Sequence, residues 1–247
     1  MRKTIFVVIL SGKNYKDSQV LNCMMNRTYA DTDLLIINRG PNPLQFDKDF
    51  IHTLGFFVNT IDIKESIGEL PLGEVCNNVI RMNDRYERFI FFDDDSILNK
   101  EYIKRLDRYH QHGVDLQIPS IRGRFDGKVY FPIINDSVCK TSDGLTINTE
   151  MNVKSLGLGL VIYRSLVEKF SAISAGVFDN HFTLNGCDTG FFSRLELLKM
   201  EKIDVAIQVV NTLNYSLAQS HDLTSKWRLL DKIRDGFLSV KVSRFRY

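Results

Sequence analysis

Short apolar segments with strand character alternate with segments of helical spacing through the first half of the chain. The expected strands are residues 4–10, 34–38, 56–63 and 89–92. Val75, Val79 and Met82 recur at helical spacing before the last of these, and a further helix is expected from about Asn99 to Gly113. This alternation predicts an α/β fold with a mixed, mostly parallel sheet flanked by helices. Ligands of such sheets bind outside the carboxyl ends of the strands.

Three consecutive carboxylates, Asp93, Asp94 and Asp95, directly follow the fourth expected strand. Carboxylates this close repel one another, and removing them from water is costly. A bound cation relieves both costs, and Mg²⁺ typically takes one or two carboxylates together with substrate phosphates. The triplet therefore predicts a Mg²⁺ or Mn²⁺ site that holds a phosphate or nucleotide; an acidic turn before the next helix is the alternative. Ser11 and Asn38 end the first two expected strands and are expected at the same edge.

The composition is that of a soluble globular protein. The 247 residues are 44% hydrophobic and 25% charged, and a net charge of +2 gives no reason to expect a nucleic-acid partner. No apolar run reaches the ~20 residues that span a bilayer, and no secretory signal is expected. The 4 cysteines are far apart, which favours reduced thiols in the cytoplasm over a zinc site.

The second half of the chain is less regular. Short strands are expected at residues 116–119 and 129–134, and the polar stretch 135–148 is either a substrate-facing loop or a disordered one. Further elements are expected at residues 157–164 (a strand), 165–170 (a helix capped by Ser165), 188–200 (an amphipathic helix) and 203–211 (a last strand). No repeat or linker divides the chain, so residues 1–225 are expected to form a single domain.

Four segments, taken in their order along the chain, share motifs with a known enzyme family. They are residues 73–80 (Gly-Glu-Val-Cys-Asn-Asn-Val-Ile), 89–95 (Phe-Ile-Phe-Phe-Asp-Asp-Asp), 157–170 followed by 177–179 (Val-Phe-Asp), and 186–195 (Gly-Cys-Asp-Thr-Gly-Phe-Phe-Ser-Arg-Leu). In this order they resemble the nucleotide-sugar glycosyltransferases of the GT-A fold, close to the large inverting family 2, whose strand and Asp-x-Asp motif match residues 89–95. Two positions depart from the family pattern. Asn38 stands where the family often carries an Asp that contacts the base, and Cys187 replaces the Glu of its Glu-Asp pair.

The resemblance implies a metal-dependent, inverting transfer of a sugar from a nucleotide-diphosphate donor, with a UDP-sugar favoured. The implied acceptor is a hydroxyl of a glycan or lipid-linked glycan in surface polysaccharide synthesis. Residues 1–113 would form the nucleotide-binding half and residues 114–225 the acceptor-binding half. Asp188 is implied as the general base, and Asp95 and His221 as ligands of Mn²⁺ or Mg²⁺. The nucleotide-binding residues are expected to be Ser11, Asn38, Asp62, Asp93 and Asp94.

Other interpretations stay open at this point. Asp188 fits a plain helix cap equally well from local sequence, and His221 fits a surface residue ahead of a last helix. A phosphohydrolase of the haloacid-dehalogenase type also carries a strand followed by Asp-x-Asp, but that motif normally opens the chain. A non-catalytic binding module of the same fold is the third reading, favoured by Asn38 and Cys187.

The last 22 residues, 226–247, hold seven Lys or Arg and two Asp, which leaves residues 1–225 with a net charge of −3. Trp227, Leu230, Ile233 and Phe237 follow helical spacing, so a basic amphipathic helix is expected. Such a helix either lies on an anionic membrane surface or packs on the core with a solvated basic face. The first alternative predicts a cytoplasmic protein in peripheral contact with the inner face of the membrane.

Overall fold

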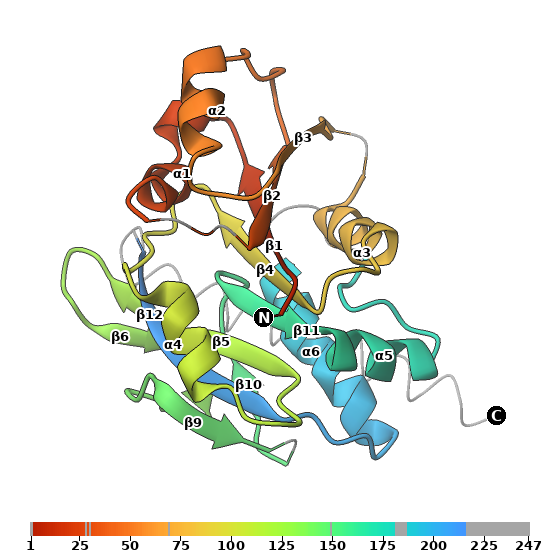
Figure 1. The fold of residues 1–247 in the computed structure, drawn as a ribbon. Helices are drawn as coiled ribbons and strands as arrows, with labels where there is room; N and C mark the ends of the chain where they lie inside the picture. Colours follow the sequence, from red (N-terminus) through yellow and green to blue (C-terminus); the bar gives the residue numbers. More distant parts are fainter. Residues whose placement is uncertain are drawn as a thin grey trace.

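A central sheet organises the chain (Figure 1). The computed structural model describes residues 2–27, 29, 31–68, 70–148, 150–180 and 187–215, with the backbone alone for residues 187–189. Within these residues the sheet runs in the order β3-β2-β1-β4-β11-β5-β12-β9, and β6 pairs with β5. Its strands, in sheet order, are β3 (Ile61–Glu65), β2 (Thr32–Asn38), β1 (Thr4–Leu10), β4 (Arg88–Asp93), β11 (Leu160–Tyr163), β5 (Leu116–Gly123), β12 (Ile207–Tyr215), β9 (Asp143–Ile147) and β6 (Val129–Phe131).

The direction of the strands divides the sheet. Neighbours among β3, β2, β1 and β4 are parallel, as are β5 and β12. β11 runs antiparallel between β4 and β5, and β9 and β6 are antiparallel to their partners. The expected mixed, mostly parallel sheet is therefore confirmed. A smaller sheet is formed by β10 (Val153–Lys154), β7 (Ile133–Ile134) and β8 (Ser137–Val138).

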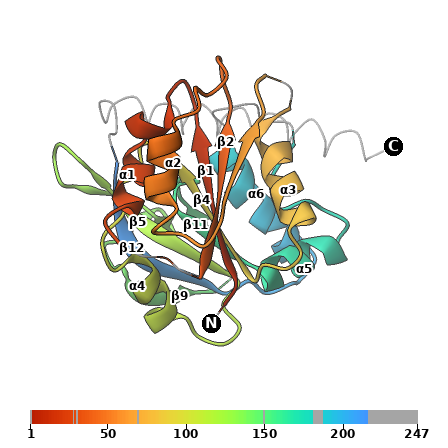
Figure 2. The same ribbon diagram turned by 45° about the horizontal axis from the view of Figure 1, so that its top comes forward.

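Helices cover both faces of the sheet and enclose two hydrophobic cores. Because side chains alternate along a strand, Phe89 and Phe91 of β4 enter one core with α3, α5 and α6, while Ile90 and Phe92 enter the other with α1, α2 and α4. Figure 2 shows α1 and α2 on one side of β1 and β2, with α3 and α6 on the other. The helices are η1 (Tyr15–Asp17), α1 (Gln19–Met24), α2 (Lys48–Leu54), α3 (Leu72–Met82), α4 (Tyr102–Tyr109), α5 (Arg164–Ala172) and α6 (Cys187–Met200). No helix in the described part of the chain is long and apolar enough to cross a membrane.

The third strand begins later than the sequence pattern predicts. Residues 56–60 follow α2 and precede β3, and the Phe56 side chain is 68% exposed. The helix before them was not expected from the sequence. Its first turn is capped by the side chain of Asp47, which accepts a hydrogen bond of 3.0 Å from the Phe50 backbone N–H. The true end of this strand is therefore Glu65 rather than residue 63.

The polar stretch 135–148 is not a single loop. It contains β8 and β9, and β9 pairs along the edge of the main sheet with β12. Its polarity follows from this edge position, because only Ile147 of β9 is buried. The expectation of a substrate-facing or disordered loop was therefore wrong for much of this segment.

Two boundaries near the carboxyl end of the described chain also differ from expectation. Ser165 lies inside α5 rather than capping it, since the helix begins at Arg164. β12 continues to Tyr215, beyond the expected end at Asn211. Asn211 has a left-handed backbone (φ 73°) at a break in the pairing with β5, and its buried amide donates to the Tyr102 carbonyl at 3.1 Å. The strand end expected at Asn211 is thus a local irregularity inside β12.

The first turn of α3 packs directly on the main chain of Asp179. A Cβ atom added to Gly73 would lie 1.9 Å from the Asp179 carbonyl oxygen, so only glycine allows this approach. One turn later, Asn77 accepts a hydrogen bond of 2.9 Å from the Phe178 N–H and donates one of 2.8 Å to the Phe178 carbonyl. These contacts attach the segment before α6 to α3.

Gly73→Ala is expected to lower the free energy of unfolding by about 1–3 kcal/mol, the usual cost of overpacking, because the new methyl group meets backbone rather than a movable side chain. Denaturant unfolding followed by circular dichroism measures this. Gly55→Ala is the control, since its Cβ would meet the nearest atom at 3.3 Å. Equal stability of Gly73→Ala and wild type would show that the two segments are not packed as described.

Candidate functional site

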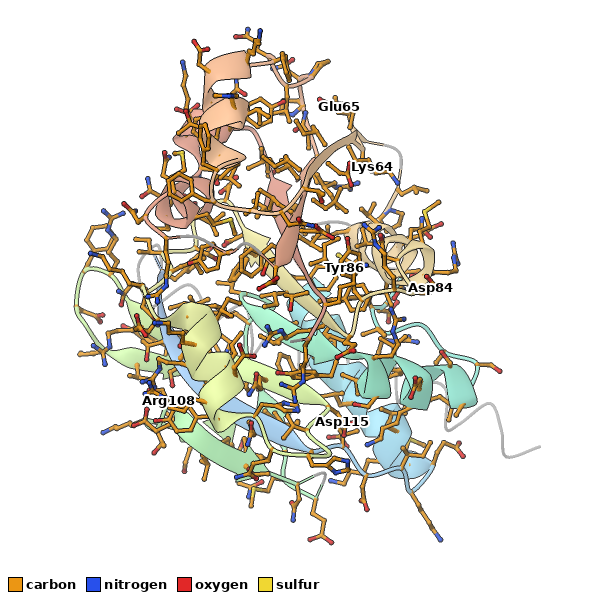
Figure 3. The ribbon with its side chains drawn as sticks, viewed as in Figure 1. Lys64, Glu65, Asp84, Tyr86, Arg108 and Asp115 are labelled. Atoms are coloured by element: carbon orange, nitrogen blue, oxygen red, sulfur yellow. The ribbon has the colours of Figure 1, made fainter. Side chains whose placement is uncertain are left out.

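The carboxyl ends of four neighbouring strands bring polar side chains to one edge of the sheet. Leu10 pairs with Asn38, Ile9 with Asp93, and Asn38 with Glu65, so the residues that end these strands lie side by side. In Figure 3 Glu65 lies toward the top of the view, at the carboxyl end of β3, whereas Tyr86 lies lower, near the start of β4. This edge is where ligands of parallel sheets bind.

Asp94 joins the end of β4 to the segment that follows β1. It is 7% exposed, and its Oδ2 accepts a hydrogen bond of 3.0 Å from the Ser11 N–H. Its backbone carbonyl accepts a bond of 2.7 Å from the Gln19 N–H at the start of α1. The carboxylate of Asp94 thus fixes the backbone of Ser11 at this edge, and the expected contact of Asp94 with the nucleotide stays a prediction.

Lys13 supplies a positive charge between two of the three acids. Its Nζ lies 2.9 Å from Asp94 Oδ1 and 2.5 Å from Asp95 Oδ1. Partial burial opposes the charged form, but the hydrogen bonds that Lys13 donates to Asp95 and Asp94, together with their negative charges, raise the pKa of Lys13 above its ordinary value. The sequence analysis missed this residue, although its place two positions after Ser11, at the end of a strand, was a signal for it.

Asp93 lies deeper than Asp95 at the end of β4. Burial, together with the charges of Asp94 and Asp95, raises the pKa of Asp93 to about 6, while hydrogen bonds from Ser96 and Tyr215 act in the other direction. A cation bound nearby would favour the charged form of this group. Asp93 and Asp95 therefore share an edge at which positive charge is stabilising.

Asn38 and Glu65 form a second cluster on the same edge. The Asn38 side chain is buried and donates two hydrogen bonds of 2.7 Å, one to the Asn42 carbonyl and one to Glu65 Oε2, while its Oδ1 accepts from the Gly40 N–H at 2.8 Å. Glu65 also accepts from the Leu44 N–H at 3.0 Å. The polar groups of Asn38 thus hold the loop after β2, and its expected contact with the nucleotide stays a prediction. Glu65, which is exposed, was missed because the strand end was misplaced.

Asp62 is not part of this cluster. It is exposed and pairs with Leu35, three residues before the Asn38–Glu65 pair and so about 10 Å back along the strand. The register of β3 therefore separates Asp62 from the Asn38–Glu65 pair, and its contact with a nucleotide stays a prediction.

The start of α6 is held near the acidic edge by aromatic packing. The rings of Phe91 and Phe178 have centroids 5.1 Å apart, and Phe178 and Phe191 lie 5.5 Å apart. Phe91 is two residues before Asp93, and Phe191 is in the first turns of α6, which begins at Cys187. The backbone of Asp188 therefore lies in the first turn of a helix anchored beside β4. The side chain of Asp188, His221 and the whole segment 226–247 lie outside the described residues.

The donor set fits a divalent cation of the kind that also takes phosphate ligands. Carboxylate oxygens of Asp94 and Asp95 converge on a single cationic nitrogen, which marks the space between them as a cation position. In the part of the chain that the structure describes, no group of three or more His, Cys, Asp or Glu could hold a metal. Two carboxylates match Mg²⁺, which commonly completes its shell with water and substrate phosphates. Asp95, with a 43% exposed side chain, is the residue best placed to reach such an ion.

Several solved structures share the fold of this chain at low sequence identity. The chain matches S. aureus TarS (residues 1–349, in complex with UDP) with a TM-score of 0.55 and 16% identity over 85% of this chain and 59% of that one. It matches GalNAc-T7 with UDP, GalNAc and Mn²⁺ with a TM-score of 0.54 and 11% identity over 87% of this chain and 44% of that one. The same TarS fragment with UDP-GlcNAc gives a TM-score of 0.53 and 15% identity over 85% of this chain and 57% of that one.

The chain thus spans less than two thirds of the length of the chains that it matches. No family model matches the sequence, and the search of curated proteins by sequence found no match. At these identities the likeness is one of fold alone. The fold of this protein is the GT-A fold of nucleotide-sugar glycosyltransferases, as the sequence motifs predicted.

Proposed function

We propose that the protein is a glycosyltransferase that moves a sugar from a nucleotide-diphosphate donor, with a UDP-sugar favoured, to a hydroxyl of a glycan or lipid-linked glycan. The observation that carries this proposal is the cation position between Asp94 and Asp95 at the carboxyl edge of a GT-A sheet. Structures of the same fold were solved with UDP, UDP-GlcNAc or Mn²⁺. These neighbours also favour a transferase over the phosphohydrolase reading.

The proposed chemistry is a single displacement with inversion. The acceptor oxygen bonds to the anomeric carbon while the bond from that carbon to the diphosphate oxygen breaks, and the electron pair leaves with the nucleoside diphosphate. Mn²⁺ or Mg²⁺ on Asp95 would neutralise the charge that develops on the leaving group. The Ser11 backbone, fixed by Asp94, and the partly buried Asp93 form the wall on which the nucleotide binds. Asp188 would take the proton of the acceptor hydroxyl.

Asp95→Ala is expected to abolish most of the gain in UDP affinity that Mn²⁺ gives, because it removes the exposed carboxylate that would ligate the metal. Isothermal titration of UDP with and without Mn²⁺ measures the gain, which should fall to less than about twofold. Asp62→Ala is the matched control, since this exposed Asp lies away from the edge, and it should keep the full gain. If Asp95→Ala also keeps the full gain, Asp95 is not a metal ligand.

Asp188→Asn is expected to lower turnover by about 100-fold or more, the usual contribution of a general base, with UDP affinity nearly unchanged. Asn has the size of Asp and can still cap a helix, so folding should persist. The assay follows slow hydrolysis of UDP-glucose, UDP-galactose and UDP-GlcNAc by the same preparation used for UDP titration. Glu196→Gln, an exposed acid on α6, is the control. Turnover near the wild-type rate would leave Asp188 as a helix cap only, and UDP binding without turnover by the wild type would favour the non-catalytic module.

We also propose that the basic segment 226–247 brings the enzyme to a membrane surface, which suits a lipid-linked acceptor. Its net charge of +5 and its helically spaced apolar residues support this. Deleting residues 226–247 should weaken co-sedimentation with vesicles that contain phosphatidylserine, and binding of the full chain should fall as salt rises. If the two forms sediment equally, or the full chain does not sediment at all, the segment has no docking role.

A further inference from the structure

The ammonium group of Lys13 sits where a metal ion would be expected. It lies within 2.9 Å of Asp94 and 2.5 Å of Asp95, and its side chain is 32% exposed. Asp95 Oδ1, the oxygen nearer to Lys13, belongs to the residue best placed to ligate a cation. A divalent ion on this oxygen would therefore meet a like charge at short range.

The backbone around Lys13 is fixed on both sides, so the position of its side chain is built into the fold. Before it, the N–H of Ser11 is bound by Asp94, and the Gly12 N–H donates to the Gly40 carbonyl at 2.7 Å. After it, Asn14 caps η1 by accepting from the Tyr15 N–H at 2.9 Å, and the Tyr15 ring is buried. Only the four-carbon stem of Lys13 is left to move.

Electrostatics decides what happens when a metal arrives. Two positive charges cannot both keep Asp95 Oδ1 at bonding distance, because their repulsion in a partly buried site is stronger than in water. The flexible stem lets the ammonium leave, whereas the Asp94 carboxylate is held by the Ser11 N–H in the turn that follows β4. The freed ammonium remains within the same edge of the sheet, where a diphosphate would offer it new oxygens.

We propose that Lys13 is a resident counter-ion of the acidic edge, which a divalent cation displaces and which then binds the diphosphate of the donor. This inference rests on the proposed function, because it assigns Lys13 to the same site. Its consequence is that metal binding and nucleotide binding are coupled. Metal alone binds weakly because it must displace Lys13, and a nucleoside diphosphate strengthens metal binding by giving the ammonium a new partner. By linkage, the metal strengthens nucleotide binding by the same factor.

The test compares wild type with Lys13→Met, which keeps the stem and removes the charge. Free Mn²⁺ measured by electron paramagnetic resonance gives the Mn²⁺ affinity with and without UDP. Without UDP, Lys13→Met should bind Mn²⁺ at least tenfold more tightly than wild type. The factor by which UDP strengthens Mn²⁺ binding should fall at least fivefold in the same variant.

Further variants test whether the change in Mn²⁺ affinity is specific to the charge of Lys13. Lys16→Met removes an exposed lysine three residues further on and should leave the Mn²⁺ affinity within about twofold of wild type. Lys13→Arg keeps a positive charge and should bind Mn²⁺ as weakly as wild type. Lys13→Gln replaces Lys13→Met if circular dichroism shows that the latter is unfolded.

The inference is overturned if loss of the Lys13 charge leaves the Mn²⁺ affinity unchanged or lowers it, or if Lys16→Met has the same effect as Lys13→Met. The outcome is separable from that of the proposed function. If wild type and all variants fail to bind UDP with Mn²⁺ present, the proposed function fails, whereas the Mn²⁺ affinities without UDP still decide whether Lys13 is the resident counter-ion.

Discussion

The buried carboxylate of Asp94 is the interaction on which the arrangement of the site depends. It binds the Ser11 N–H on one side and the Lys13 ammonium on the other, while its backbone carbonyl receives the first N–H of α1. Two segments that are about 80 residues apart in sequence are thereby fixed against each other at the carboxyl ends of β1 and β4. A buried carboxylate is costly unless its oxygens are hydrogen-bonded. The bonds of Asp94 therefore hold the turn after β4 in place, and with it the neighbouring carboxylates of Asp93 and Asp95.

The strands and helices that could be predicted are those whose own apolar pattern shows which of their faces are buried. The runs in β1, β2 and β4 are continuously apolar because both faces of these strands are buried under helices, and the buried Phe191, Leu195 and Leu198 of α6 recur at helical spacing. α2 and β9 carried no such signal. α2 is a seven-residue helix whose cap, Asp47, stands in a turn-rich stretch, and β9 lies at an edge where most of its side chains are exposed.

The site was predictable to the same extent. Asp93, Asp94 and Asp95 are contiguous and follow a buried strand, so their position at the ligand edge follows from sequence alone. The separate roles of the three do not, because they depend on the loop after β1, which brings Lys13 and Ser11 to them. Asp62 and Glu65 also show this limit, because their places relative to the edge depend on where β3 ends. The sequence pattern placed the end of this strand at residue 63, whereas the register with β2 brings Glu65 level with Asn38.

A crystal structure of the protein with UDP and Mn²⁺, with manganese located by its anomalous scattering, tests most directly that this edge is a metal-assisted nucleotide site. We expect manganese bonded to the Asp95 carboxylate, with the diphosphate between the metal and the Ser11–Lys13 segment and the Lys13 ammonium moved from Asp95 to a phosphate oxygen. Manganese away from Asp95, or UDP bound elsewhere than at the carboxyl ends of β1 and β4, would contradict it.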